Sequence, residues 1–181
     1  MTAQANTATT CAKLSVPDMI TTGVFTAIYF CIVGVCALVC NVVSGGAANI
    51  MLPALAALLA GPVYMLLAAR VRTFGAISVM GIVLGLFLFV SGHFATSLIT
   101  SVVFSLLADL VARIGAHRNK AALLGSYVVF SFGCVGPIMP MWMMKDAYVA
   151  NLARKGKDTA YIDHLFSYVN GVSLVVVIVA I

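Results

Sequence analysis

Six long stretches of this sequence contain almost no charged residue, and this pattern limits the possible folds more than any other feature. About 20 helical residues cross the hydrocarbon core of a bilayer, and the first five stretches have about that length. The six are Ile20–Val43, Asn49–Ala69, Phe74–Ser91, Phe94–Ala112, Ala121–Met144 and Phe166–Ile181. Their apolar residues are continuous and do not alternate with polar ones, which favours helices over membrane strands. The sequence therefore predicts an all-α, polytopic membrane protein, a six-helix transmembrane domain over residues 17–181.

The composition excludes most soluble functions. Only 8% of the residues are charged, and the mean hydropathy is +1.14, whereas a soluble domain carries about 25% charged residues. The net charge of +5 lies in short basic clusters between apolar runs, which suits a lipid surface and not a nucleic acid. There is no HExxH motif, no paired intramembrane carboxylates and no nucleotide-binding loop. We therefore expect a lipid bilayer as the surroundings, no nucleic-acid partner and no enzymatic activity.

The basic residues also predict the orientation. Arg70 and Arg72 lie between the second and third stretches, and Arg113, Arg118 and Lys120 lie between the fourth and fifth, with no acid among them. Such connections face the cytoplasm. Residues 1–16 then form a polar cytoplasmic tail, and both termini are inside. The sixth stretch ends after only 16 residues, a rise of about 24 Å, so we expect this helix to be truncated at Ile181.

Small residues at a spacing of about four mark close helix contacts in membranes. The first stretch has such a stripe, formed by Gly23, Ala27, Cys31 and Gly34. It can pack within the molecule or dock on a partner protein, and the residues favour neither. The third stretch has Gly81 and Gly85 at the same spacing.

A polar line follows one face of the fourth stretch: Ser97, Ser101, Ser105 and Asp109, each four residues apart. Serine hydroxyls can bond carbonyls of their own helix, and we expect this here. Arg113 follows Asp109 by four residues, so the sequence predicts an ion pair of these two at the membrane surface.

The end of the fifth stretch is the best candidate for a ligand pocket. Pro137 and Pro140 prevent a regular helix and free backbone carbonyls, and broken helices at membrane depth usually line a cavity. A kinked helix end with methionines as filling is the alternative. The candidate substrate-binding residues, all at the same expected outer depth, are Asn41, Asn49, His93, Met139, Trp142, Met143, Lys145, Asp146, Tyr148, Tyr168 and Asn170.

Metal or haem binding is a weaker alternative. Thioether and imidazole ligands suit copper or haem iron, and Met51, Met141 and His164 join His93 at the outer side. No fixed ligand spacing supports this, so we expect no metal site and no cofactor.

Several segments together resemble the MptD/Trep_Strep family, which groups S components of energy-coupling factor (ECF) transporters. The resemblance extends from Lys13 to about Tyr148 and rests on DMITTGVFTAIYF (18–30), LPAL (52–55), AGPVYML (60–66), FGAISVMGIVLG (74–85), SGHF (91–94), LADL (107–110) and MKDAY (144–148).

This resemblance implies a function. ECF S components are six-helix subunits of the prokaryotic cytoplasmic membrane that bind a micronutrient at the outer side. They deliver it together with a T component and two cytoplasmic ATPase subunits, as an ABC-type importer. The family implies that Gly23 and Ala27 face the T component. The ligand stays open among vitamins, modified bases, haem-like macrocycles and metal chelates. The alternative is a solitary secondary carrier or channel, for which Asp109 is the one intramembrane acid and no internal repeat is visible.

Overall fold

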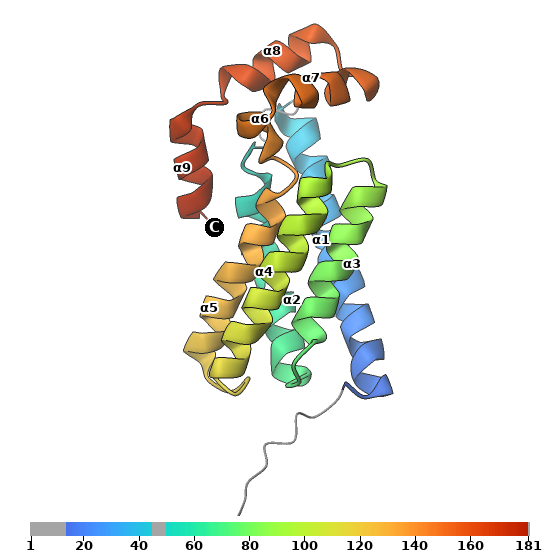
Figure 1. The fold of residues 1–181 in the computed structure, drawn as a ribbon, viewed down its shortest axis with the longest axis vertical. Helices are drawn as coiled ribbons and strands as arrows, with labels where there is room; N and C mark the ends of the chain where they lie inside the picture. The colour runs from blue at the N-terminus through green and yellow to red at the C-terminus, as the bar shows by residue number, and fades with distance from the viewer. Residues whose placement is uncertain (1–13, 45–49, 181) are drawn as a thin grey trace, which may run out of the picture.

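The computed structural model describes residues 14–44 and 50–180, and within them the chain is helical without a strand (Figure 1). In chain order the elements are α1 (Val16–Ser44), α2 (Leu52–Arg70), α3 (Ala76–Val90), α4 (Ala95–Ile114), α5 (Lys120–Ser131), the 3-10 helix η2 (Phe132–Val135), α6 (Pro140–Met143), α7 (Lys145–Arg154), α8 (Thr159–Ser167) and α9 (Gly171–Ala180). Helices α1 to α5 run side by side along the long axis. Helices α6, α7 and α8 lie across one end of this bundle. We call these three helices the cap and this end the capped end; α9 descends beside it.

The bundle has the helices of a membrane protein. By length and composition α1, α2 and α4 can each cross a bilayer, and α8 with α9 would be a fourth span if this pair, bent by 70°, counts as one. Helix α3 and the continuous α5–η2 segment are apolar but shorter. Large apolar side chains are exposed along the sides of these helices, where a soluble protein would place polar groups.

Two predicted segments differ in detail from the observed helices. The fifth is broken as its prolines indicated, since α5 passes into η2, a turn and the single turn of α6. The prediction of one helix from Phe166 onward is wrong, because α8 ends at Ser167 and α9 begins at Gly171. The amide of Ser173 donates to Asn170 Oδ1 at 2.8 Å, and the amide of Asn170 donates to Ser173 Oγ at 3.1 Å. This reciprocal cap starts a new helix.

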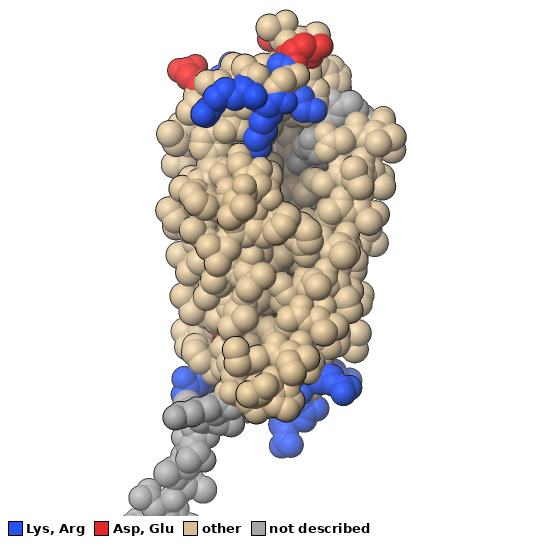
Figure 2. Space-filling view, turned by 90° about the vertical axis from the view of Figure 1, so that its right-hand side faces the viewer, with Lys and Arg blue, Asp and Glu red and all other residues tan. Residues whose placement is uncertain are grey.

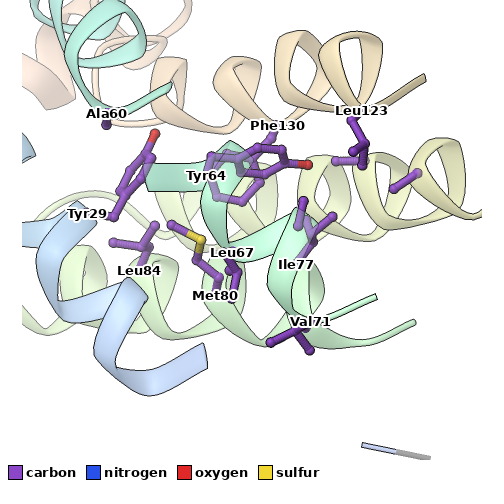
Figure 3. Packing of buried hydrophobic residues seen from close by; sticks show 14 residues of the cluster. Tyr29, Ala60, Tyr64, Leu67, Val71, Ile77, Met80, Leu84, Leu123 and Phe130 are labelled. Atoms are coloured by element: carbon purple, nitrogen blue, oxygen red, sulfur yellow. The ribbon is translucent and has the colours of Figure 1, made fainter. Parts of the chain in front are cut away.

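The core of the bundle lies between the five helices α1 to α5 (Figure 3). Tyr64 is fully buried at its centre, with its ring 4.9 Å from that of Phe130. Its hydroxyl lies 2.6 Å from Ser126 Oγ, which in turn donates to the carbonyl oxygen of Ala108. The buried hydroxyls of Tyr64 and Ser126 therefore both have a partner, as burial away from water requires.

Helices α3 and α4 meet through small residues. A Cβ built on Gly81 would overlap Ser105 Cβ and lie 3.2 Å from the carbonyl oxygen of Ser101, and a Cβ on Gly85 would lie 2.8 Å from Ser101 Cβ. Ser101 and Ser105, in the polar line of α4, therefore pack against Gly81 and Gly85 of α3. Such contacts drive helix association in lipid, where burial of apolar surface contributes little.

The predicted ion pair of Asp109 with Arg113 at the membrane surface is wrong. Asp109 is fully buried and not at the surface. Its Oδ2 accepts hydrogen bonds from the amides of Gly75 and Ser78, at 2.7 and 3.1 Å, and from Ser78 Oγ at 2.8 Å. These amides belong to the start of α3, where a carboxylate is favoured by the free N–H groups and the helix dipole. Asp109 of α4 thus caps α3.

We expect Asp109→Asn to lower the free energy of unfolding by about 1–2 kcal/mol, because a charge-assisted acceptor becomes a neutral one. Titration with sodium dodecyl sulfate in mixed micelles measures the change. Asp163→Asn, an exposed substitution on α8, serves as the control and should leave the transition in place. Equal effects of the two substitutions would contradict the capping role.

Charged residues lie at the two ends of the molecule. Lys and Arg side chains gather at both ends of the face shown in Figure 2, and the wide middle of this face carries none. Arg70, Arg72, Arg113, Arg118 and Lys120 lie in or beside the α2–α3 and α4–α5 connections, away from the cap. The capped end mixes Lys145, Arg154, Lys155 and Lys157 with three aspartates.

Candidate functional site

A cavity of about 440 Å³ lies at the capped end between the bundle and the cap. Small-molecule sites are typically concave spaces of about 300–1,000 Å³, so this cavity has the size of a ligand site. Its wall comes from α1, the α3–α4 connection, the turn before α6, and α7 and α8. The lining residues are Leu38, Asn41, His93, Phe94, Pro137, Tyr148, Asn151, Leu152, Lys155, Lys157, Tyr161 and Leu165.

Helix α7 presents one face to this cavity. Tyr148, Asn151, Leu152 and Lys155 follow the spacing of three and four that places side chains on one side of a helix. Tyr161 and Leu165 repeat the spacing of four on α8. Both helices are amphipathic, so they lie across the bundle end with their apolar sides inward.

The aromatic part of the wall is ordered by ring contacts. Tyr148 stacks on Phe94 with ring centroids 5.9 Å apart and an interplanar angle of 16°. The rings of Tyr148 and Phe166 are nearly perpendicular, with centroids 6.3 Å apart. Burial, with a smaller contribution from Tyr161, raises the pKa of Tyr148 to about 12. The hydroxyl of Tyr148 is therefore protonated at neutral pH and can donate a hydrogen bond.

His93 lies in the short connection between α3 and α4. Its Nδ1 is 3.1 Å from the carbonyl oxygen of Leu88. Burial lowers the pKa of His93, and the nearby Lys155 lowers it further. The ring is consequently neutral at pH 7, and the positive charge at the cavity belongs to the lysines.

We expect Lys155→Gln to raise the pKa of His93 while leaving it below the ordinary value, because burial is the larger cause of the shift. Titration of the histidine ring protons by NMR measures it. Lys145→Gln removes a charge from the same cap outside the cavity lining and should leave the His93 titration unchanged. A pKa that does not move in Lys155→Gln would show that the two groups are not neighbours.

The lowered pKa of His93 also predicts how stability depends on pH. The ordinary pKa of histidine is about 6.5. Just below this pH, His93 is protonated in the unfolded chain but stays largely neutral in the folded protein, because its pKa there is lower. The contribution of neutral His93 is therefore complete above about pH 6.5 and is lost as the pH falls toward the folded pKa. We expect the thermal midpoint to fall more steeply over this acidic range in the wild type than in His93→Gln. Parallel curves would contradict the assignment.

The structure brings together some of the candidate residues and separates others. Asn41, His93 and Tyr148 line the cavity. Asn49 lies outside the described residues. Met143 and Asp146 are exposed, and Lys145 places its ammonium 5.0 Å from the Phe166 ring centroid, away from the lining.

The remaining candidates border other hollows. Met139 and Trp142 line an apolar space of about 150 Å³ against Val177 and Ile178 of α9. The indole N–H of Trp142 donates to the carbonyl oxygen of Asn170 at 3.2 Å, so this side chain holds α9 to the cap. Tyr168 and Asn170 border a more open hollow of about 500 Å³ beside Met51.

Nine lining residues were missed by the sequence reasoning: Leu38, Phe94, Pro137, Asn151, Leu152, Lys155, Lys157, Tyr161 and Leu165. The segment from Lys145 to Leu165 lies between the fifth and sixth apolar stretches, so no helix was predicted in it. Its helical spacing of Tyr148, Leu152 and Lys155 was a usable signal. Nothing local in the sequence pairs that face with Asn41 or His93.

A second candidate surface is a groove between α1 and α3. It has a volume of about 280 Å³ and is lined by Met19, Gly23, Thr26, Ala27, Phe30, Val79, Val83, Leu84 and Phe87. A Cβ built on Gly23 or on Gly34 meets nothing within 4 Å among the described residues. Cys31 is exposed on α1, and Gly34 is half-buried. The small residues of α1 therefore face outward and do not pack against the rest of the bundle.

Metal ligands do not cluster in the described structure. Residues 14–44 and 50–180 contain no group of three or more His, Cys, Asp or Glu side chains that could hold a metal ion. His164 is exposed and contacts Tyr168 edge-on, with ring centroids 5.4 Å apart. It is not part of the cavity wall that includes His93.

Comparisons with known proteins agree with the membrane fold. A family model described as a hypothetical bacterial integral membrane protein (Trep_Strep) matches residues 16–181. Comparison with curated proteins and with solved structures gives no match. The family match extends over all the described helices, from α1 to α9. The chain therefore belongs to the Trep_Strep family of bacterial integral membrane proteins.

Proposed function

We propose that this protein is the S component of an ECF-type importer, the subunit that captures a micronutrient and delivers it with a T component and two ATPase subunits. The observation that carries the proposal is the cavity under the cap. It is closed by two amphipathic helices and mixes aromatic, amide and cationic groups, the composition of a small-molecule site. The protein itself hydrolyses no ATP in this scheme.

The charge distribution supports an orientation with the cap outside the cytoplasmic membrane. The opposite end carries Arg70, Arg72, Arg113, Arg118 and Lys120 in or beside short connections without an acid. Such basic connections stay in the cytoplasm. The cavity then lies near the outer surface, where a nutrient arrives, and the N-terminus is cytoplasmic.

The groove between α1 and α3 supports docking of a membrane partner. Its residues are apolar or small, and Gly23 and Ala27 leave room for another helix to approach closely. In the proposal this surface receives the T component. The alternative, a solitary carrier, needs an ion site in the membrane. Asp109 is engaged by three donors at the start of α3, which favours a structural role for this acid.

Affinity purification of the tagged chain from its host membranes tests the proposal. We expect the T component and both ATPases to co-purify. In vesicles that hold the complex with its ATPases on the inside, nutrient should be taken up only when ATP is present inside. Purification of the chain alone under every condition would overturn the proposal. Uptake by the chain alone, driven by an ion gradient, would establish the carrier instead.

A further inference from the structure

We propose that the cavity under the cap binds an organic anion: a small molecule with a carboxylate or phosphate group on an apolar, partly aromatic body. The inference rests on the proposed function only in treating this cavity as the capture site. It adds the chemical class of the ligand, which neither the fold nor the family match supplies.

The charges at the cavity are positive. Lys155 and Lys157 belong to its lining, and none of the lining residues is an aspartate. The aspartates of the cap are placed elsewhere. The Asp158 side chain accepts from the amide of Tyr161 at 2.9 Å and caps α8, while Asp146 and Asp163 are exposed.

The two lysines are held against the wall of the cavity. Lys157 places its ammonium 4.6 Å from the ring centroid of Tyr161. Lys155 reaches across to the α3–α4 turn, where its Nζ lies 3.8 Å from the position of a Cβ built on Gly92. It also lowers the pKa of His93. Two ammonium groups from one segment thus border the same space, and both would attract an anionic ligand bound there.

The start of α4 adds a partial positive charge. This 20-residue helix begins just after Phe94, which lines the cavity, and the apolar side chain of this N-cap residue makes no capping hydrogen bond. The N-terminus of a helix carries about half a positive charge and free N–H groups, which favour anions. The helix end and the two lysines therefore act in the same direction.

The rest of the wall suits an apolar body with a few polar groups. The stacked rings of Phe94 and Tyr148, with Leu38, Leu152 and Leu165, provide flat and aliphatic surface. Asn41 and Asn151 add amides, and the Tyr148 hydroxyl can donate. A volume of about 440 Å³ exceeds what an inorganic ion needs and fits a drug-sized molecule.

A fractionated nutrient source tests the inference. The low-molecular-mass part of a yeast extract is separated by ion exchange into anionic, cationic and neutral pools. Each pool is added to the protein in phosphatidylcholine nanodiscs, and the thermal midpoint is followed by tryptophan fluorescence. Two doubly substituted proteins are compared: Lys155→Gln with Lys157→Gln, and the control Lys145→Gln with Arg154→Gln, which removes the same charge from the same cap outside the lining.

We expect the anionic pool to raise the midpoint of the wild type and of the control. The Lys155/Lys157 protein should need at least about tenfold more of this pool for the same shift, because losing even one charge-assisted hydrogen bond costs a factor of about that order. Mass spectrometry of the retained molecules then identifies the ligand. Since all four residues are exposed in part, their substitution should leave the fold intact, and the midpoints without any pool verify this.

Other outcomes overturn the inference in distinguishable ways. If the cationic or neutral pool stabilises the protein and the anionic pool does not, the cavity still captures a nutrient, but the inference that this nutrient is an anion is refuted. Equal responses of the two substituted proteins would place the anion elsewhere. A shift produced by phosphatidylglycerol alone, and lost in the Lys155/Lys157 protein, would identify a lipid headgroup as the anion. Stabilisation by no pool would refute the inference, while co-purification with the T component would still support the proposed function.

Discussion

Replacing Gly81 with valine is expected to prevent α3 and α4 from packing and to lower the free energy of unfolding by about 3 kcal/mol or more. A Cβ at this position would overlap Ser105 Cβ and approach the backbone oxygen of Ser101 to 3.2 Å. Neither atom belongs to the far end of a long side chain that could turn away, so the two helices must separate. Overpacking of this kind costs about 1–3 kcal/mol, occasionally more.

Gly23→Val is the matched control for this prediction. It makes the same change in the middle of a helix, but a Cβ on Gly23 meets nothing within 4 Å among the described residues. Unfolding by sodium dodecyl sulfate and the yield of monodisperse protein measure both variants. In a Gly81→Ala background, Ser105→Gly should recover part of the loss by removing the overlapping atom. If the two valine variants unfold alike, the close approach of α3 and α4 is refuted.

If the groove between α1 and α3 docks the T component as proposed, replacing Gly23 or Ala27 with leucine should reduce the amount of co-purified T component by about tenfold or more. Both residues line the open groove between α1 and α3. A leucine there would hold a docking helix away, and a penalty of about 1–3 kcal/mol corresponds to roughly a tenfold or larger loss of affinity. The isolated variants should fold and bind ligand normally, because the groove is far along α1 from the cap.

Gly125→Leu on α5 provides the control for docking. A Cβ on Gly125 meets only Val111 Cγ1, at 4.0 Å, among the described residues, so the same enlargement is tolerated on a different face. Co-purification with the tagged chain is quantified for the three variants against the wild type. Normal assembly of both Gly23→Leu and Ala27→Leu would place the docking surface elsewhere on the protein.

The sequence by itself determined the class of fold and most of the helices. Continuous apolar runs such as Ile20–Val43 have one stable state in a bilayer, because every backbone polar group must be satisfied within the segment. The breaks at Pro137 and Pro140 were equally local, since proline removes a donor wherever it stands. The start of α9 was missed, although the cap between Asn170 and Ser173 is a local pattern.

Only the tertiary structure decided which faces meet. The serines of α4 were expected to bond carbonyls of their own helix, as Ser105 does with Val102. Their packing against Gly81 and Gly85 of α3 was not predicted. Asp109 reads as a partner of Arg113, yet it caps the start of another helix. Spacing along one helix identifies a face but not its neighbour, because that neighbour is chosen by the fit of surfaces remote in sequence.

For the cavity, too, the sequence predicted part of the lining, and only the tertiary structure showed which residues meet there. Asn41, His93 and Tyr148 were candidates from their expected depth, but no helix was predicted between Lys145 and Leu165, although Tyr148, Leu152 and Lys155 have helical spacing. The meeting of these candidates with Lys155 and Lys157 depends on two short helices folding back over the bundle. That fold-back is set by burial of their apolar sides against the bundle end, a long-range contact that local propensity does not encode. The sequence therefore determined that the chain lies in a membrane, whereas the tertiary structure alone placed two lysines over one cavity.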